Sequence, residues 1–196
     1  MCNIRLETER LIVRPYEEKD LPEYHKLFSN KENMYYVDDL IMNTVEESQE
    51  SLKEAIEKMK TGKVRRFCIA LKENDKLIGG TGYDIIKETP IGKIGGMGWF
   101  IMPEYQNKGY ITEAVKKVLE FAFMQDNCVR VETGCYKDNI PSEKVMSSVS
   151  DRVYTPNPDN VKIYDKLYAE YKILHDYFGR GANDVMKRLK EVKANV

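Results

Sequence analysis

The sequence predicts an α+β fold in which a mixed sheet is flanked by helices. Short segments with alternating apolar and polar residues, typical of half-buried strands, lie between longer segments with apolar residues at helical spacing. The E-N-D-K stretch at 73–76 is a hairpin turn between two strand segments. A strand–helix–strand unit over 97–136 requires a parallel pair joined by a right-handed crossover.

The first predicted elements are one strand and two helices. Residues 3–14 alternate, which predicts a strand with a bend at Glu9. Residues 17–29 carry apolar side chains at helical spacing. Residues 44–62 begin with Thr44, a good helix cap, and have acids early and lysines late, which predicts a second helix.

The sheet and the longest helix follow along the chain. The alternation predicts strands, and the apolar stripes predict helices, so that the first 150 residues read β-α-α-β-β-β-α-β-α. The strands are expected at 67–71, 77–86, 93–102 and 128–136, and the helices at 109–125 and 141–148.

The pattern of the sequence changes after Ser150. A turn cluster, Y-T-P-N-P-D-N at 154–160, is followed by helical patterns with no strand pattern. The first of these patterns places tyrosines and leucines on one face. We therefore expect a domain over 1–150 and a helical tail over 151–196.

Composition excludes several classes of protein. Lys+Arg 31 against Asp+Glu 32 gives a net charge of -1, which argues against a nucleic-acid or membrane-surface partner. No apolar run is long enough for a membrane span, and the charged N-terminus is unlike an export signal. The four cysteines are scattered and only two histidines are present, so we expect no metal site and reduced thiols in the cytoplasm.

One loop carries most of the chemical information. It joins the strand ending near Met102 to the helix that begins at Gly109, and a helix N-terminus after a strand favours an anion such as pyrophosphate. The loop is neither a P-loop nor a dinucleotide fingerprint, because G-x-x-x-x-G-K-[ST] and G-x-G-x-x-G are both absent. From these residues alone, a plain strand–helix connection is the alternative.

The run Q-N-K-G-Y-I-T-E-A at 106–114 resembles the acetyl-CoA loop of the GNAT N-acetyltransferases. Four further segments resemble, in order, the branch that acetylates ribosomal-protein N-termini and small amines. They are L-E-T-E-R-L-I-V-R-P at 6–15, W-F-I-M-P-E-Y at 99–105, R-V-E-T-G-C at 130–135 and D-N-I-P-S at 138–142. The resemblance covers about 3–148 and implies a mostly antiparallel sheet with a splayed parallel pair.

The resemblance also implies a cofactor, acetyl-CoA, and an acceptor, a primary amine on a peptide N-terminus or a small molecule. A backbone N–H near Ile101 would stabilise the oxyanion, Asn139 would bind the cofactor arm, and Ser142 would protonate the departing thiolate. The implied cofactor-binding residues are Phe100, Ile101, Met102, Gln106, Asn107, Lys108, Gly109, Tyr110, Ile111, Thr112, Asn139 and Ser142.

Each assignment has a simpler alternative. Ser142 follows Pro141 at a helix start and is also a capping candidate, while Asn139 also suits a strand end. The fourth-strand glutamate of many relatives is absent, because this region reads G-G-M-G-W at 95–99. We therefore consider a water relay, Tyr83 or Asp84 for deprotonation, and assign Tyr36, Tyr83 and Asp84 to the acceptor side.

The end of the chain departs from the family. The two final GNAT strands have no counterpart after K-V-M-S-S-V-S, and the sequence from about Val153 resembles the C-terminal end of FGGY sugar kinases, ribulokinase in particular. The strand at 129–135 would then be an exposed sheet edge, which invites association. We expect the tail to cover this edge, within one chain or in a homodimer.

Three hypotheses follow from these features. The first is an acetyl-CoA-dependent N-acetyltransferase. The second is a non-catalytic CoA-binding or interaction protein, which the missing glutamate and missing strands favour. The third is a chain joined by accident that folds poorly.

Overall fold

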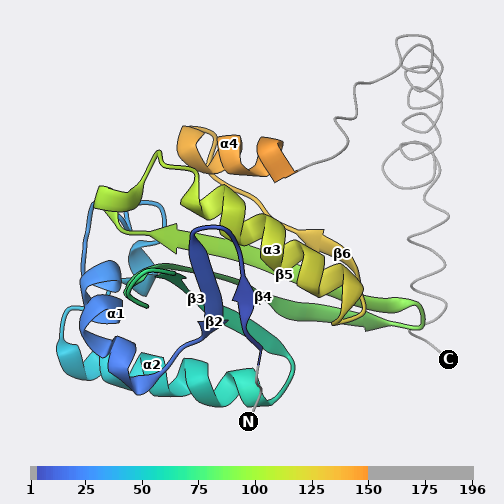
Figure 1. Ribbon diagram of the computed structural model, residues 1–196, viewed down its shortest axis with the longest axis horizontal. Coiled ribbons are helices and arrows are strands. Elements are labelled where there is room, and N and C mark those ends of the chain that lie inside the picture. The colour runs from blue at the N-terminus through green and yellow to red at the C-terminus, as the bar shows by residue number, and fades with distance from the viewer. Residues whose placement is uncertain (1–3, 150–196) are drawn as a thin grey trace, which may run out of the picture. The chain divides into compact units, whose positions relative to one another are not determined.

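A computed structural model describes residues 4–149, which belong to a compact unit, Met1–Asp151 (Figure 1). The predicted tail, 151–196, lies outside the described residues, so the expected boundary at 150 and the tail's place on the sheet stay predictions. Besides three short 3₁₀ turns, the elements are β1 (Leu6–Glu7), β2 (Leu11–Pro15), α1 (Leu21–Phe28), α2 (Val45–Lys60), β3 (Val64–Leu71), β4 (Leu77–Thr89), β5 (Gly92–Ile101), α3 (Tyr110–Met124), β6 (Cys128–Glu132) and α4 (Ile140–Val149).

The strands form one six-stranded sheet in the order β1-β2-β3-β4-β5-β6. All neighbouring pairs are antiparallel except β5 and β6, which are parallel and are connected through α3. The predicted mixed, mostly antiparallel sheet with one parallel pair is therefore confirmed, as are the helices at 17–29, 44–62 and 109–125 to within a few residues.

Two strand predictions were wrong in extent. Residues 3–14 form a hairpin instead of one bent strand, because Thr8 and Leu11 exchange hydrogen bonds that close the chain back on itself. The strand expected at 128–136 ends at Glu132, because the chain leaves the sheet beyond this point while β5 continues to Ile101. Within residues 4–149, β6 is the last strand and forms an edge of the sheet, with Val129 exposed.

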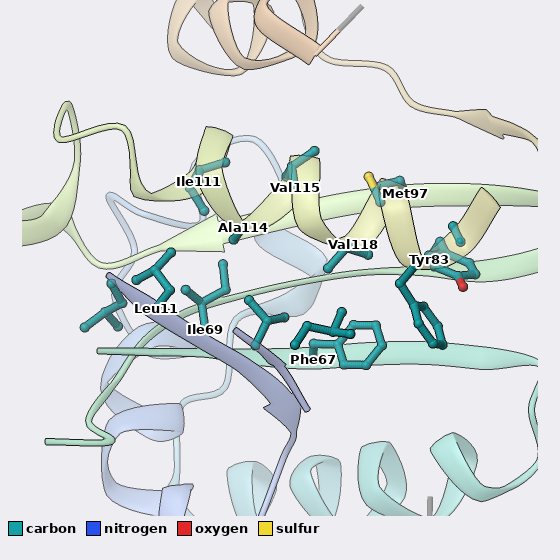
Figure 2. Packing of buried hydrophobic residues seen from close by; sticks show 14 of the residues in the cluster. Leu11, Phe67, Ile69, Tyr83, Met97, Ile111, Ala114, Val115 and Val118 are labelled. Atoms are coloured by element: carbon teal, nitrogen blue, oxygen red, sulfur yellow. The ribbon is translucent and has the colours of Figure 1, made fainter. Parts of the chain in front are cut away.

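Helices cover both faces of the sheet, and each face has its own hydrophobic core (Figure 1). Helix α3 packs its predicted apolar stripe, including Ala114, Val115 and Val118, on one face (Figure 2). Helices α1 and α2 pack on the other face, where Leu27 and Leu52 are buried. Burial of each aliphatic side chain contributes about 1.5–3 kcal/mol to the free energy of folding, so the two helical layers stabilise the sheet between them.

Helix α2 begins as its sequence predicts. The Thr44 side chain accepts a hydrogen bond from the Glu47 N–H at 3.2 Å, and the Glu47 carboxylate accepts one from the Thr44 N–H. This reciprocal capping box satisfies N–H groups that the first turn would leave unpaired. None of the described helices is long and apolar enough to cross a membrane.

Asp126 is a buried residue just after the C-terminal end of α3, and its carboxylate connects several neighbouring side chains. Its carboxylate accepts two hydrogen bonds from Arg65 at 3.0 Å, one from Lys93 at 2.9 Å and one from the Tyr83 hydroxyl at 2.8 Å. Burial alone would raise the pKa of Asp126, but the hydrogen bonds from Arg65, Lys93 and Tyr83 outweigh it and hold this pKa below its usual value. Asp126 is therefore ionised in the folded protein.

We expect the stability that Asp126 contributes to be lost in acid. A carboxyl group whose pKa is lower in the folded state stabilises fully above its unfolded pKa of about 3.9, and this contribution fades as the pH falls through the folded value. We expect urea unfolding to give a higher unfolding free energy for the wild type than for Asp126→Asn at pH 7. This difference should become smaller below about pH 4. Asp84→Asn, in an exposed pair with Arg66, is the matched control, and an equal gap for both variants would contradict this account.

Candidate acetyl-CoA and acceptor site

The parallel strands separate halfway along β5. Strand β6 pairs with β5 only from Lys93 to Gly96, and the last link between the two segments is a hydrogen bond from the Thr133 hydroxyl to the Met97 carbonyl at 2.9 Å. Strand β5 continues to Ile101 while the chain after Glu132 leaves the sheet. A V-shaped opening therefore lies along the second half of β5.

Backbone groups of β5 face this opening. Carbonyl and N–H directions alternate along a strand, and the Met97 carbonyl points toward the β6 side while the Gly98 carbonyl accepts from Thr81 of β4. By this alternation Trp99 and Ile101 present their N–H and C=O groups to the opening. The sequence-based expectation of a backbone donor near Ile101 agrees with this geometry.

The loop before α3 ends at the mouth of the same opening. Gly109 is the N-cap residue, with φ 78°, a left-handed conformation that glycine adopts without strain. Because Gly109 has no side chain, it makes no capping hydrogen bond, and the first N–H groups of α3 are left for another acceptor. These groups and the positive end of the helix dipole make an anion-binding site.

The N-terminal hairpin braces this loop, a role that the sequence did not indicate. Arg10 donates to the Lys108 carbonyl at 3.0 Å and to the Glu113 carboxylate at 2.8 Å, and its guanidinium lies 4.4 Å from the centre of the Tyr110 ring. The Thr8 hydroxyl donates to Glu113 at 2.6 Å. The hairpin therefore fixes both the last loop carbonyl and the first turn of α3.

Removing this brace should weaken anion binding at α3. We expect Arg10→Met to raise the dissociation constant for acetyl-CoA about 3- to 10-fold, because one ionic hydrogen-bond network contributes about 1 kcal/mol where it is partly exposed. Calorimetric titration measures this, and Arg5→Met, in an exposed pair with Glu7 of the same hairpin, is the control. A dissociation constant unchanged by Arg10→Met would show that the loop holds its shape without the brace.

Two adjoining cavities occupy the opening. The cofactor cavity, about 610 Å³, runs from β5 past the loop to α4, and the aromatic cavity, about 470 Å³, lies beside Met97 and Tyr136. The residues that line both are Asn33, Tyr36, Trp99, Phe100, Asn139 and Ser142.

Most of the predicted cofactor-binding residues come together in the cofactor cavity. Those lining it are Phe100, Ile101, Gln106, Asn107, Gly109, Tyr110, Ile111, Thr112, Asn139 and Ser142. Met102 does not line it, because its side chain is buried against the α1 and α2 layer and its N–H donates to Ile78. Lys108 does not line it either, and its ammonium lies over the Tyr105 ring.

The three residues predicted for the acceptor side do not all lie at the cavities. Tyr36 lines both cavities, whereas Tyr83 and Asp84 line neither. Tyr83 is only 1% exposed and points into the α3 core, where burial and the hydrogen bond to Asp126 raise its pKa well above the usual value (Figure 2). Asp84 points to the other face and pairs with Arg66 at 2.9 Å. Both side chains therefore lie outside the two cavities.

Asn139 and Ser142 lie at the start of α4. The Asn139 side-chain oxygen accepts from the Ser142 N–H at 3.3 Å, so Asn139 is the capping residue and Ser142 is not. The Asn139 amide nitrogen keeps its donors for a ligand. Among the described residues the Ser142 hydroxyl has no hydrogen-bond partner, and it faces both cavities.

A strand splayed from its neighbour beside an uncapped helix N-terminus is a geometry suited to an extended ligand with an anionic end. The family described as acetyltransferase (GNAT) domain matches residues 10–149. The chain therefore belongs to the GNAT acetyltransferase family.

Individual proteins agree with this membership. The uncharacterised N-acetyltransferase YnaD of Bacillus subtilis is 31% identical over 150 residues, covering 76% of this chain and 83% of that protein. A GNAT-family acetyltransferase structure from Bacillus anthracis has a TM-score of 0.66 and 25% identity, covering 78% of this chain and 86% of that one. RimL in complex with coenzyme A has a TM-score of 0.63 and 16% identity, covering 74% and 81%.

The resemblance to ribulokinase is also confirmed. The ribulokinase of Halalkalibacterium halodurans is 56% identical over 63 residues, which cover 32% of this chain and only 11% of the kinase. Because 63 residues exceed the length of 151–196, a match that includes this tail begins at about residue 134 or earlier. The acetyltransferase family model extends to residue 149 and therefore also covers Asn139 and Ser142.

Proposed function

We propose that this chain is an acetyl-CoA-dependent N-acetyltransferase that acts on a primary amine. One observation carries the proposal: the backbone edge of β5 and the open N-terminus of α3 line one continuous cavity. This combination suits a ligand with a pyrophosphate at one end and an amide-containing arm that pairs like an added strand.

The residues in the cavity fit acetyl-CoA. The N–H groups at the start of α3 suit the pyrophosphate, with Gly109 leaving room for it. The backbone of Trp99 and Ile101 and the Asn139 amide suit the arm. RimL, whose fold this chain shares, holds coenzyme A in its solved structure, which supports the same ligand here.

Acetyl-CoA supplies an activated acetyl thioester: the amine nitrogen bonds the carbonyl carbon as the C–S bond breaks, the amine releases one proton and the sulfur takes one up. The Ile101 N–H is directed to hold the negative charge that develops on the oxygen. The Ser142 hydroxyl, which lines the cavity without another partner in the described residues, would give the sulfur its proton and regain one from solvent.

A Ser142→Ala variant tests this role. Loss of a general acid typically costs about 10²-fold or more in turnover, so we expect kcat to fall by about that factor while the acetyl-CoA dissociation constant changes far less. Ser148→Ala is the control, because Ser148 lines the same cavity but donates its hydroxyl to the Val145 carbonyl at 2.8 Å. Full turnover by Ser142→Ala would remove Ser142 from the mechanism.

A second function is a non-catalytic CoA-binding protein. One observation favours it: the described residues that line the aromatic cavity include no aspartate, glutamate or histidine that could act as a general base. Free-thiol release from acetyl-CoA over an amine panel separates the two functions. Turnover supports the enzyme, and binding without turnover supports the non-catalytic protein.

Location and assembly complete the proposal. Cys68, Cys128 and Cys135 are free thiols, which suits the reducing cytoplasm. The exposed edge of β6 remains the expected contact for the tail or for a second copy, and the elution volume of the full chain in size-exclusion chromatography distinguishes monomer from dimer.

A further inference from the structure

The aromatic cavity differs from the cofactor cavity in its chemistry. Glu32 and Lys144 line the cofactor cavity, whereas every described residue that lines the aromatic cavity is uncharged. Seven residues line the aromatic cavity but not the cofactor cavity. They belong to the loop after α1, to β5 and to the segment that follows β6. They are Val37, Met97, Gly98, Thr133, Gly134, Cys135 and Tyr136.

Aromatic rings form one side of this cavity. Tyr36 and Tyr136 stack with ring centres 5.8 Å apart and an interplanar angle of 23°. The Tyr36 hydroxyl donates to the Asp138 carbonyl at 3.1 Å, which fixes its ring. Trp99 and Phe100 of β5 also line the cavity, although their side chains pack against opposite cores of the sheet. Such surfaces favour aromatic ligands through stacking and hold an ammonium group through cation–π attraction.

The lack of a carboxylate selects among amines. A polyamine or a basic peptide would bring a second cation to the cavity, where the lining has no carboxylate to pair with it, so part of the hydration of that cation would be lost without compensation. An amine with a single ammonium group has no such cost.

Resting on the proposed function, we propose that the acceptor is a small primary amine carried on an uncharged aromatic body. The amine nitrogen would face Trp99 and the cofactor cavity, and the ring would lie against Tyr36 and Tyr136. A volume of about 470 Å³ is suited to a small molecule.

The test compares three amines with the full-length protein: 2-phenylethylamine, spermidine and a short basic peptide with a free N-terminus. We expect kcat/KM, measured by thiol release, to be at least about 10-fold higher for 2-phenylethylamine. Trp99 is the chain's one tryptophan, so its fluorescence should change on titration of 2-phenylethylamine into protein saturated with CoA. A higher kcat/KM for spermidine or the peptide would overturn the acceptor class and leave the proposed function standing.

Matched tyrosine variants locate the effect. Tyr136→Ala removes a wall of the aromatic cavity only, and should lower kcat/KM for 2-phenylethylamine about 10-fold without changing acetyl-CoA binding. Tyr35→Ala is the control, because Tyr35 is 71% exposed and lines neither cavity. Equal effects of the two variants would overturn the acceptor assignment, whereas absence of acetyl-CoA binding by the wild type would overturn the proposed function with it.

Discussion

Replacing Gly109 with valine should weaken acetyl-CoA binding about 5- to 30-fold. Gly109 has φ 78°, and a left-handed backbone costs an L-residue about 1–2 kcal/mol, which corresponds to that range at 1.4 kcal/mol per tenfold. A β-branched residue is the least tolerant of this conformation, so the loop must shift and move the N–H groups of α3. Calorimetric titration of acetyl-CoA measures the change.

The asparagine variant is the matched control for this prediction. Asparagine enters the left-handed region more readily than other non-glycine residues, as Asn107 does in the same loop with φ 58°. Gly109→Asn should therefore retain more binding than Gly109→Val. Circular dichroism melting checks that both variants fold. Equal binding by the valine variant and the wild type would show that the start of α3 is not the anion site.

Replacing Asp20 with alanine should lower the unfolding free energy by about 3–5 kcal/mol, the cost of breaking a buried ion pair. Arg14 and Asp20 are 3% and 4% exposed and form two hydrogen bonds at 2.8 and 2.9 Å. Asp75 also binds the Arg14 Nε at 2.9 Å, but it cannot occupy the two guanidinium donors that Asp20 leaves. Urea unfolding of the full chain measures the loss.

A surface pair gives the control for the Asp20 result. Glu54 and Lys58 are exposed and lie four residues apart on α2, so Glu54→Ala should change the unfolding free energy by about 0.5 kcal/mol or less. A loss below about 1 kcal/mol for Asp20→Ala would mean that the desolvation cost of the ion pair nearly cancels the attraction between its charges. Removing Asp20 would then relieve part of that cost. The stability of the sheet would then rest on apolar packing alone.

Local patterns predicted the elements that local chemistry determines. The apolar stripe of α3, the Thr44 cap and the turn at 73–76 each depend on residues close in the chain, and each is in the structure. Strand–loop–helix order left the loop at 106–112 as either an anion site or a plain connection, and the resemblance to the GNAT acetyl-CoA loop favoured the ligand site; most of its residues line the cofactor cavity.

Long-range contacts explain what the sequence did not predict. Arg10 contacts loop residues about a hundred positions further along the chain, and no sequence pattern near Arg10 or near the loop predicts this contact. Tyr83 was assigned to the acceptor side because of its place near the glycine-rich strand, but the alternation of β4 turns it toward Asp126 in the opposite direction. Tyr136 was read as part of a strand, whereas the splay of β6 frees it to stack on Tyr36.

Titration of the full-length protein with acetyl-CoA tests the central claim most directly. The account predicts saturable binding with one site per chain, competition by CoA, and weaker binding by Gly109→Val than by Gly109→Asn. These results would place the ligand at the N-terminus of α3. Absence of any heat of binding at millimolar acetyl-CoA, for a protein that melts cooperatively, would contradict it.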